Sequence, residues 1–363
     1  MSLHGGDVWQ VAAEAGLPVS ELLDFSANIN PRGLPPRALE RVARDAANPR
    51  LLGLYPDPSA RSLRIALSRH LSVPPEAIVV GPGAEALLDP TLRSYSTQRA
   101  LVPIPAFGEY RRVCEQQGME FVPYRLDRAK CFRLPTEDFR RAIQTRRPGL
   151  IILNNPHNPS GAGLPVEAIR GIVDTAHGAG AAVLLDEAYI DYGPSATLIS
   201  DAAGKPGLVV IRSLTKFYGC PALRAGYAVA HPETARRIAS FLPIWAVTQL
   251  AMDVFAEALE DGEHAARSLR ENAAHREELA QSLQQIGLLV FPSAANFLFL
   301  ELAPGMPPAS ELRRRLIQRH SLLIRNCDSY EGLAPGRYIR VAVRSAVENR
   351  CLVKALAEEL GSQ

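Results

Sequence analysis

Lysine is scarce in this chain of 363 residues. Among 40 basic side chains, the lysines are Lys130, Lys205, Lys216 and Lys354, so chemistry that needs an amine has few candidates. The formal net charge is only +2. We therefore expect no broad electrostatic attraction to nucleic acid or to an anionic membrane. Long apolar runs are also missing, so we expect neither a membrane span nor a signal peptide.

Cysteine is sparse as well, and its pattern excludes several kinds of site. The five residues are widely scattered: Cys114, Cys131, Cys220, Cys327 and Cys351. No pair has the spacing of a zinc site or of a redox motif, and we expect no metal centre. Five reduced, mostly buried thiols are typical of a reducing compartment, so the prediction is a cytoplasmic protein.

The length predicts one large domain plus a smaller one. Hydrophobic residues make up 47% and charged residues 21%, as in ordinary globular enzymes. We predict a large domain over 51–235 and a small α+β domain over 236–363. The first 50 residues look irregular, and we expect them to pack on the active site and on the small domain.

Short apolar runs alternate with helical stretches in the middle of the chain. Seven candidate strands are 77–80, 100–104, 120–126, 149–153, 181–185, 207–211 and 225–230. Several are apolar on both faces, as in strands that helices cover on both sides. The pattern predicts an α/β fold with a mainly parallel seven-stranded sheet. Further on, strands over 287–291, 296–302, 322–326 and 337–343 accompany helices over 264–286 and 310–320 and a last helix.

Chemistry-bearing residues follow four of the predicted strands. The segments are "GPGAEALL", "NNPHNPSG", "DEAYIDY" and "RSLTKFYG". Ligands of parallel α/β sheets bind beyond the carboxyl ends of the strands. These four strand ends therefore describe one site.

Lys216 and Asp186 are the most distinctive groups at these strand ends. An amine between Thr215 and Phe217, with little charge nearby, can have a depressed pKa and form a Schiff base. A lone lysine is otherwise a surface residue with a buried stem. Asp186 either caps a helix or faces the ring nitrogen of a pyridine-type cofactor. Asn158 and Tyr189 suit hydrogen bonds to a ring phenolate, or are a turn asparagine and a core tyrosine.

The glycines of "GPGAEALL" are typical of a loop that cradles a phosphate. A short loop that opens a helix offers free N–H groups and the positive end of the helix dipole. The spacing is neither that of a P-loop nor G-x-G-x-x-G. Ser213, Thr215 and Arg224 could supply hydroxyls and a guanidinium to the same phosphate.

In their order and spacing, "NNPHNPSG", "DEAY" and "SLTKFYGCPALRAGY" resemble the aminotransferase-type family of pyridoxal-phosphate (PLP) enzymes, fold type I. The resemblance covers nearly the whole chain. It implies that Lys216 holds PLP as a Schiff base and that Asp186 faces the pyridine nitrogen. It further implies that Asn158 and Tyr189 bind the ring oxygen.

The same resemblance implies the remaining cofactor contacts. Those to the cofactor phosphate would come from Gly83, Ala84, Glu85, Ser213, Thr215 and Arg224. Phe107 or Tyr110 would lie over the ring, and we favour Phe107. Tyr55 matches a tyrosine that reaches the partner subunit's phosphate, which implies a homodimer with shared sites. Pro82 departs from the family pattern, where asparagine is common, and proline offers no N–H to the phosphate.

Within the family, the chain is similar to two groups whose substrates carry a phosphate: histidinol-phosphate aminotransferases and the L-threonine O-3-phosphate decarboxylases of cobalamin synthesis. "HGG" near the start and "LLDFSANINPRGLP" make the decarboxylase resemblance the closer one. It implies decarboxylation of a small phosphorylated amino acid to (R)-1-aminopropan-2-ol O-phosphate. Transamination of a phosphorylated amine is the alternative, and a catalytically silent PLP-fold binding protein is a remote one.

The resemblance also implies substrate contacts from His4, Gly5, Gly6, Asn28, Asn158, Arg325 and Arg340. Arg340 matches the family's carboxylate-binding arginine and would otherwise be an exposed strand arginine. His4 and Arg325 match ligands of the substrate phosphate. The two glycines would let the backbone pass close to that phosphate.

Overall fold

The computed structural model describes residues 5–193 and 197–361, and seven strands form its large sheet. They are β2 (Ile78–Gly81), β3 (Arg99–Ile104), β4 (Glu120–Arg125), β5 (Leu150–Asn154), β6 (Ala182–Asp186), β7 (Leu208–Ser213) and β8 (Gly226–Ala230). The order is β2-β8-β7-β6-β5-β3-β4, and within this sheet only β8 runs antiparallel to its neighbours. The predicted mainly parallel seven-stranded sheet is confirmed.

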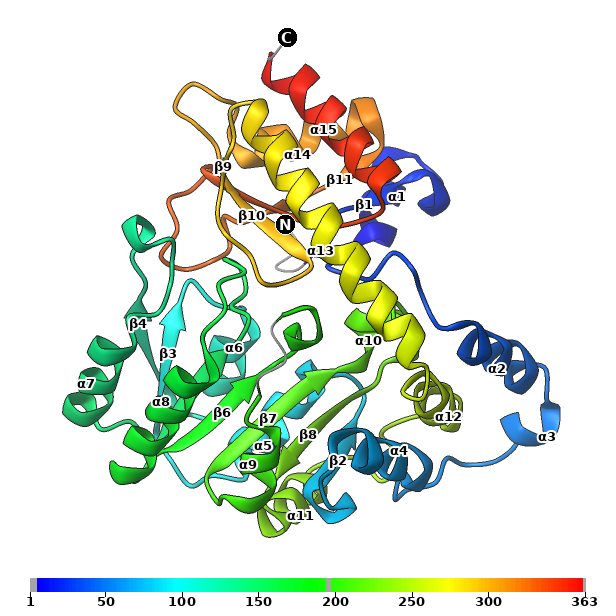
Figure 1. Cartoon of the computed structure of the whole chain (residues 1–363), viewed down its shortest axis with the longest axis vertical. Coiled ribbons are helices and arrows are strands. Elements are labelled where there is room, and N and C mark those ends of the chain that lie inside the picture. Colours follow the sequence, from blue (N-terminus) through cyan, green and yellow to red (C-terminus); the bar gives the residue numbers. More distant parts are fainter. Residues whose placement is uncertain (1–4, 194–196, 362–363) are drawn as a thin grey trace.

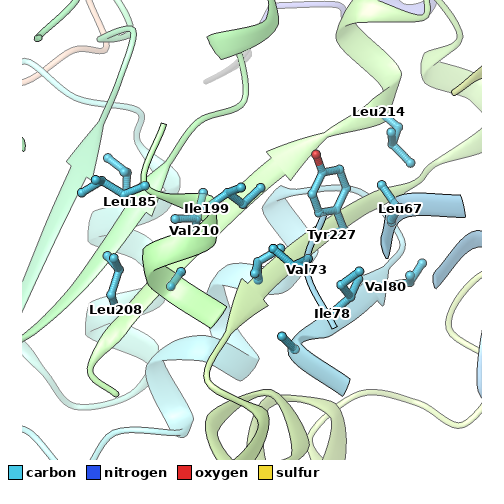
Figure 2. Packing of buried hydrophobic residues seen from close by; sticks show 14 of the residues in the cluster. Leu67, Val73, Ile78, Val80, Leu185, Ile199, Leu208, Val210, Leu214 and Tyr227 are labelled. Atoms are coloured by element: carbon cyan, nitrogen blue, oxygen red, sulfur yellow. The ribbon is translucent and has the colours of Figure 1, made fainter. Parts of the chain in front are cut away.

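Both faces of the large sheet are buried. Successive residues of one strand alternate between two apolar clusters: Val183 and Leu185 belong to one, and Ala182 and Leu184 to the other. Figure 2 shows part of the first cluster, where side chains from β6, β7, β8 and β2 meet. Such strands have no solvent face, which is why their sequences are uninterrupted apolar runs.

Helices supply the other half of each cluster. The helices of this part are α2 (Pro36–Ala46), α3 (Pro49–Leu52), α4 (Arg61–Leu71), α5 (Leu88–Arg93), α6 (Glu109–Gln116), α7 (Thr136–Arg146), α8 (Val166–Gly178), α9 (Ile199–Gly204), α10 (Leu214–Phe217), α11 (Pro232–Ser240) and α12 (Gln249–Ala258). The buried residues of α4, α7, α8, α9 and α12 pack on one face, and those of α5, α6 and α11 on the other.

A second, antiparallel sheet has the order β12-β13-β10-β9. Its strands are β9 (Leu289–Val290), β10 (Phe297–Glu301), β12 (Arg325–Asn326) and β13 (Tyr338–Ala342). The helices α13 (Gly262–Gln285), α14 (Ala309–His320) and α15 (Ala346–Leu360) cover it, at the top of Figure 1. The predicted helices over 264–286 and 310–320 and the last helix are thereby confirmed. Across the described ranges, no helix has the length and apolar character needed to cross a bilayer.

Two predictions for the chain's elements are wrong. The segment 322–326 is two strands: β11 (Leu322–Leu323) pairs in parallel with β1 (Leu23–Asp24), and β12 pairs with β13. The first 50 residues are not irregular, because they contain α1 (Val8–Ala15), α2 and the first half of α3. In α2 the charged residues are structural, since Arg41 bonds Asp45 and, at 2.9 Å, Asp253 of α12.

Short 3₁₀ helices complete the connections. They are η1 (Val19–Glu21), η2 (Pro75–Ala77), η3 (Glu85–Leu87), η4 (Arg128–Lys130), η5 (Ile190–Tyr192) and η6 (Pro221–Leu223). η3 follows the end of β2 and η5 follows the end of β6, so both lie where ligands of parallel sheets bind.

Candidate active site

A cavity of about 430 Å³ lies between the carboxyl ends of the large sheet's strands and the second sheet. Segments far apart in the sequence line it, from the N-terminal segment to β13. Of the predicted site residues, those lining this cavity are Gly5, Asn28, Phe107, Asn158, Tyr189, Lys216, Arg325 and Arg340. The structure therefore brings the predicted amine, ring-binding and substrate-binding groups to one place.

Lys216 lies in α10, directly after β7. Its backbone carbonyl accepts hydrogen bonds from the Asn30 N–H and from the Tyr192 hydroxyl, each at 3.0 Å. Burial, together with the charges of Arg340 and Arg224, lowers the pKa of Lys216 to about 8. A partly neutral amine at a fixed position is suited to attack a carbonyl carbon.

Asp186 is the last residue of β6, and its carboxylate is held from two sides. The Tyr110 hydroxyl donates to Oδ2 at 2.5 Å and the Ala188 N–H donates to Oδ1 at 2.9 Å. Burial raises the pKa of Asp186, whereas these hydrogen bonds and the charge of Lys216 lower it. A cation such as a protonated ring nitrogen beside this carboxylate would offset the cost of its burial.

Asn158 and Tyr189 present hydrogen-bond donors to the cavity. The amide oxygen of Asn158 accepts from Arg340 at 2.5 Å and from the Tyr330 hydroxyl at 3.1 Å. The Tyr189 oxygen accepts from the amide of Asn28 at 3.3 Å. With these acceptors satisfied, the Asn158 amide hydrogens and the Tyr189 hydroxyl hydrogen suit an anionic oxygen.

Beyond one end of the sheet, glycines and hydroxyls gather around a guanidinium. A Cβ on Gly83 would lie 2.6 Å from Nη2 of Arg224, so only glycine lets that side chain approach. Gly83 also has φ of 100°, a backbone conformation that favours glycine. The Ser213 and Thr215 hydroxyls lie 2.8 Å apart.

The strand register brings that cluster together with the turn after β2. Gly226 pairs with Gly81 on one side and with Ser213 on the other. A Cβ on Gly226 would lie 2.5 Å from the backbone N of Ala84. The Glu85 carboxylate pairs with Arg112 at 3.0 Å, so Glu85 could contact a phosphate only through its backbone.

Arg325 and Arg340 lie directly opposite each other on β12 and β13. Both are buried and both line the cavity. Nη2 of Arg325 donates to the Ser329 hydroxyl at 2.7 Å, and Nη2 of Arg340 donates to the Ser26 carbonyl at 2.9 Å. Arg340 is 5% exposed, so the alternative of an exposed strand arginine is wrong.

The other predicted site residues that the structure describes do not line the cavity itself: Gly6, Gly83, Ala84, Glu85, Asp186, Ser213, Thr215, Arg224 and Tyr55. His4 lies outside the described residues. Its neighbour Gly5 passes close to the Ser26 carbonyl, which a Cβ would approach to 2.2 Å, and the Gly6 N–H donates to the Ser26 hydroxyl at 2.9 Å. Tyr55 is 77% exposed and does not line the cavity of its own chain.

Sequence reasoning missed the roles of two tyrosines. Tyr110 was considered only as a candidate for ring stacking, yet its hydroxyl binds Asp186. Phe107, the favoured candidate, lines the cavity and meets Tyr110 edge-on at 5.7 Å. Tyr330 was not singled out at all. The sequence offers one signal for it: Tyr330 lies between the two strands that carry Arg325 and Arg340.

Comparison with known proteins shows the family to which this chain belongs. The family model described as aminotransferase class I and II matches residues 20–356. The chain belongs to that family. It is 36% identical to the threonine-phosphate decarboxylase of Salmonella typhimurium, over 99% of this chain and 97% of that protein. The predicted family and fold type are thereby confirmed.

Solved structures agree on the fold. The L-threonine-O-3-phosphate decarboxylase from Porphyromonas gingivalis matches with a TM-score of 0.82 and 25% identity, over 94% of this chain and all of that one. The histidinol-phosphate aminotransferase from Sinorhizobium meliloti, in complex with pyridoxal-5'-phosphate, matches with a TM-score of 0.87 and 24% identity, over 98% and 94%. The second match extends to the fold alone.

Proposed function

We propose that the chain is a PLP-dependent decarboxylase that converts L-threonine O-3-phosphate to CO₂ and (R)-1-aminopropan-2-ol O-phosphate. The observation that carries the proposal is the pair of opposed, buried arginines in the cavity that also holds Lys216. Two neighbouring cations of this kind suit a substrate with two anionic groups. The 36% identity to a threonine-phosphate decarboxylase supports the same reading.

The residues of the cavity fit PLP. A buried amine and two donors suited to a ring oxygen line it, the buried Asp186 carboxylate ends the neighbouring strand β6, and the glycine turn with Arg224 offers a phosphate site. Because Gly83 has no side chain, the Arg224 guanidinium can lie against this turn, where it would be available to a phosphate. When bound, PLP supplies a ring that takes up the electron pair left at Cα.

The chain's own residues orient the substrate and move the proton. Arg340 would hold the carboxylate and Arg325 the phosphate. Asn28 keeps its amide oxygen buried and without a hydrogen-bond partner in the described part of the chain, which leaves an acceptor for a substrate donor. Lys216, with a pKa of about 8, can return a proton to Cα once the carboxylate has left as CO₂.

The orientation of the substrate decides between decarboxylation and amino transfer. The bond at Cα that breaks is the one held perpendicular to the cofactor ring. Fixing the phosphate and the carboxylate at two points leaves the molecule little freedom to rotate. Anchors on β12 and β13 therefore select the reaction, while Lys216 and Asp186 serve either one.

A product assay tests the proposal. Holoenzyme incubated with L-threonine O-3-phosphate should release CO₂ and the amino-alcohol phosphate in equal amounts. Lys216→Ala should lower the rate by at least about 1,000-fold, because it removes both the covalent attachment and the proton carrier. No CO₂ release, with glutamate formed from histidinol phosphate and 2-oxoglutarate, would show an aminotransferase instead.

A homodimer with shared sites is part of the proposal. Tyr55 stacks on Trp245 with ring centroids 4.3 Å apart, and both are exposed. Leu52, Leu54 and Ile244 are exposed nearby in the sequence. Such an apolar surface suits a partner subunit, whose cofactor phosphate Tyr55 would reach. We also propose a cytoplasmic location, in keeping with five free cysteines.

A further inference from the structure

Tyr330 is the side chain that joins the three groups around the substrate. It lies in the connection between β12 and β13 and is 6% exposed. Its hydroxyl donates to the amide oxygen of Asn158 at 3.1 Å and accepts from Nη1 of Arg340 at 3.1 Å. The guanidinium of Arg325 lies over its ring, 5.6 Å from the centroid. One residue thus contacts both arginines and a ring-binding asparagine.

The two arginines need such a residue. Like charges directly opposite each other on neighbouring strands repel. Burial strengthens the repulsion, because water screens it less. The ring of Tyr330 attracts the Arg325 cation through its face, and the hydroxyl offers Arg340 an acceptor. The tyrosine therefore holds the two guanidinium groups at a set separation before a substrate arrives.

The Tyr330 hydroxyl donates one hydrogen bond and accepts another, so its two partners fix its orientation. Burial raises the pKa of Tyr330, so the group keeps its proton at neutral pH. The hydroxyl donates its hydrogen bond to the Asn158 oxygen, and its oxygen accepts the hydrogen bond from Arg340. Moving the hydroxyl would turn the Asn158 amide and Arg340 together. The carboxylate anchor is thereby tied to the residue that fixes the cofactor ring.

We propose that Tyr330 is a positioning residue that selects decarboxylation over amino transfer by aligning Arg340 with the cofactor ring. The proposal rests on the proposed function. Without the hydroxyl, the carboxylate is held less firmly and the Cα–H bond can take the perpendicular position. Lys216 would then take the Cα proton and pass it to the cofactor carbon that carried the aldehyde, the amino group would stay on the cofactor, and water would supply the oxygen of the 2-oxo acid. A second 2-oxo acid, such as 2-oxoglutarate, would have to accept the amino group before the next turnover.

Tyr330→Phe is the direct test, because it keeps the ring over Arg325 and removes only the hydroxyl. We expect kcat/KM for CO₂ release to fall about 10- to 100-fold, the range for losing a hydrogen bond to a charged group. The ratio of 2-oxo acid to CO₂ should rise at least about tenfold. Both products are measured from one incubation with L-threonine O-3-phosphate and an excess of 2-oxoglutarate, which accepts the amino group after each amino transfer.

A binding measurement separates positioning from general damage. Phosphoethanolamine has an amine and a phosphate but no carboxylate. Its inhibition constant should stay within about twofold in Tyr330→Phe and should rise in Ser329→Ala, which removes the hydroxyl that accepts from Nη2 of Arg325. The PLP affinity of the apoprotein should fall in Tyr330→Phe, because Asn158 loses one of its two donors.

Tyr338→Phe is the matched control. Tyr338 is equally buried, at 6% exposed, and lies on β13, but it stacks on Phe299 and does not line the cavity. Its product ratio should equal that of the wild type. An unchanged ratio in Tyr330→Phe, with a wild type that releases CO₂, would overturn the role of Tyr330 alone. A wild type that releases no CO₂ would overturn the proposed function and this inference together.

Discussion

At the scale of single residues, the environment of Lys216 has a measurable consequence. With a pKa of about 8, roughly a tenth of its amine is neutral at pH 7, against about 0.03% for an ordinary lysine. Since only the neutral amine attacks an aldehyde, attachment of PLP to the apoprotein should accelerate about tenfold from pH 7 to pH 9 and then level off. Borohydride trapping at timed intervals, followed by mass analysis of the Lys216 peptide, gives the rate.

The charges around Lys216 provide a control for this prediction. Arg340 lowers the pKa of Lys216, so Arg340→Gln should move the midpoint of the pH profile upward. Burial lowers the pKa of Lys216 more than these charges do. In Arg340→Gln the pKa of Lys216 should therefore stay well below that of a free lysine. A wild-type rate that still rises tenfold between pH 9 and pH 10 would contradict the assigned environment.

Which residues could be predicted from the sequence depends on where their partners lie. Lys216 and Asp186 stand at strand ends, and a parallel sheet gathers strand ends whatever the details of packing. The roles of Tyr110 and Tyr330 could not be predicted in this way. Their hydroxyls meet partners 76 and 172 positions away in the sequence, and no spacing rule encodes such contacts.

At the scale of elements, the hydrophobic pattern predicts a strand or helix correctly where apolar residues alone make up its buried surface. Apart from the edge strand β4, the strands of the large sheet are buried on both faces, so their apolar runs stand out from the helices between them. Helix α2 was missed because its charged residues, such as Arg41, make ion pairs with a neighbouring helix. The break between β11 and β12 was missed because the apolar run continues through Ile324, where the chain changes pairing partners.

An ion pair between the ends of β6 and β7 fixes the spacing of the catalytic elements. Glu187 follows Asp186, and Arg212 precedes Ser213; their side chains pair at 2.8 Å and are almost fully buried. Among the described residues, Glu187→Ala would leave the buried Arg212 with the more distant Asp191, 3.7 Å away, as its acidic partner. We expect the free energy of unfolding to fall by about 3–5 kcal/mol, as measured by denaturant titration of the holoenzyme.

An exposed ion pair serves as the comparison for Glu187. Asp174 of α8 pairs with Lys205 at 2.5 Å, and the two side chains are 57% and 35% exposed. Asp174→Ala should change the free energy of unfolding by less than about 1 kcal/mol. If the two variants lost equal free energy of unfolding, the buried pair would stabilise the fold no more than an exposed one does.

At the scale of the whole molecule, the cavity depends on elements from both sheets and from the N-terminal segment. The parallel pairing of β1 with β11, the strand that leads into β12 of the second sheet, holds that segment in place, and Asn28 contacts Tyr189. The domain boundaries at residues 50 and 235 stay a prediction; α12, which begins after residue 235, packs on the large sheet. The strands of each sheet could be predicted from the local hydrophobic pattern, whereas the way the two sheets come together around the cavity could not.

The proposed homodimer is open to a test on the exposed apolar surface around Tyr55. Ile244 is 64% exposed and directly precedes Trp245, whose ring stacks on Tyr55. Ile244→Glu would place a charge in a buried interface, so sedimentation equilibrium should show a shift from the dimer towards the 39.4 kDa chain. Val347→Glu, at a site 63% exposed on α15, should leave the dimer intact. A monomeric wild type, or a dimer that survives Ile244→Glu unchanged, would rule out this surface as the interface.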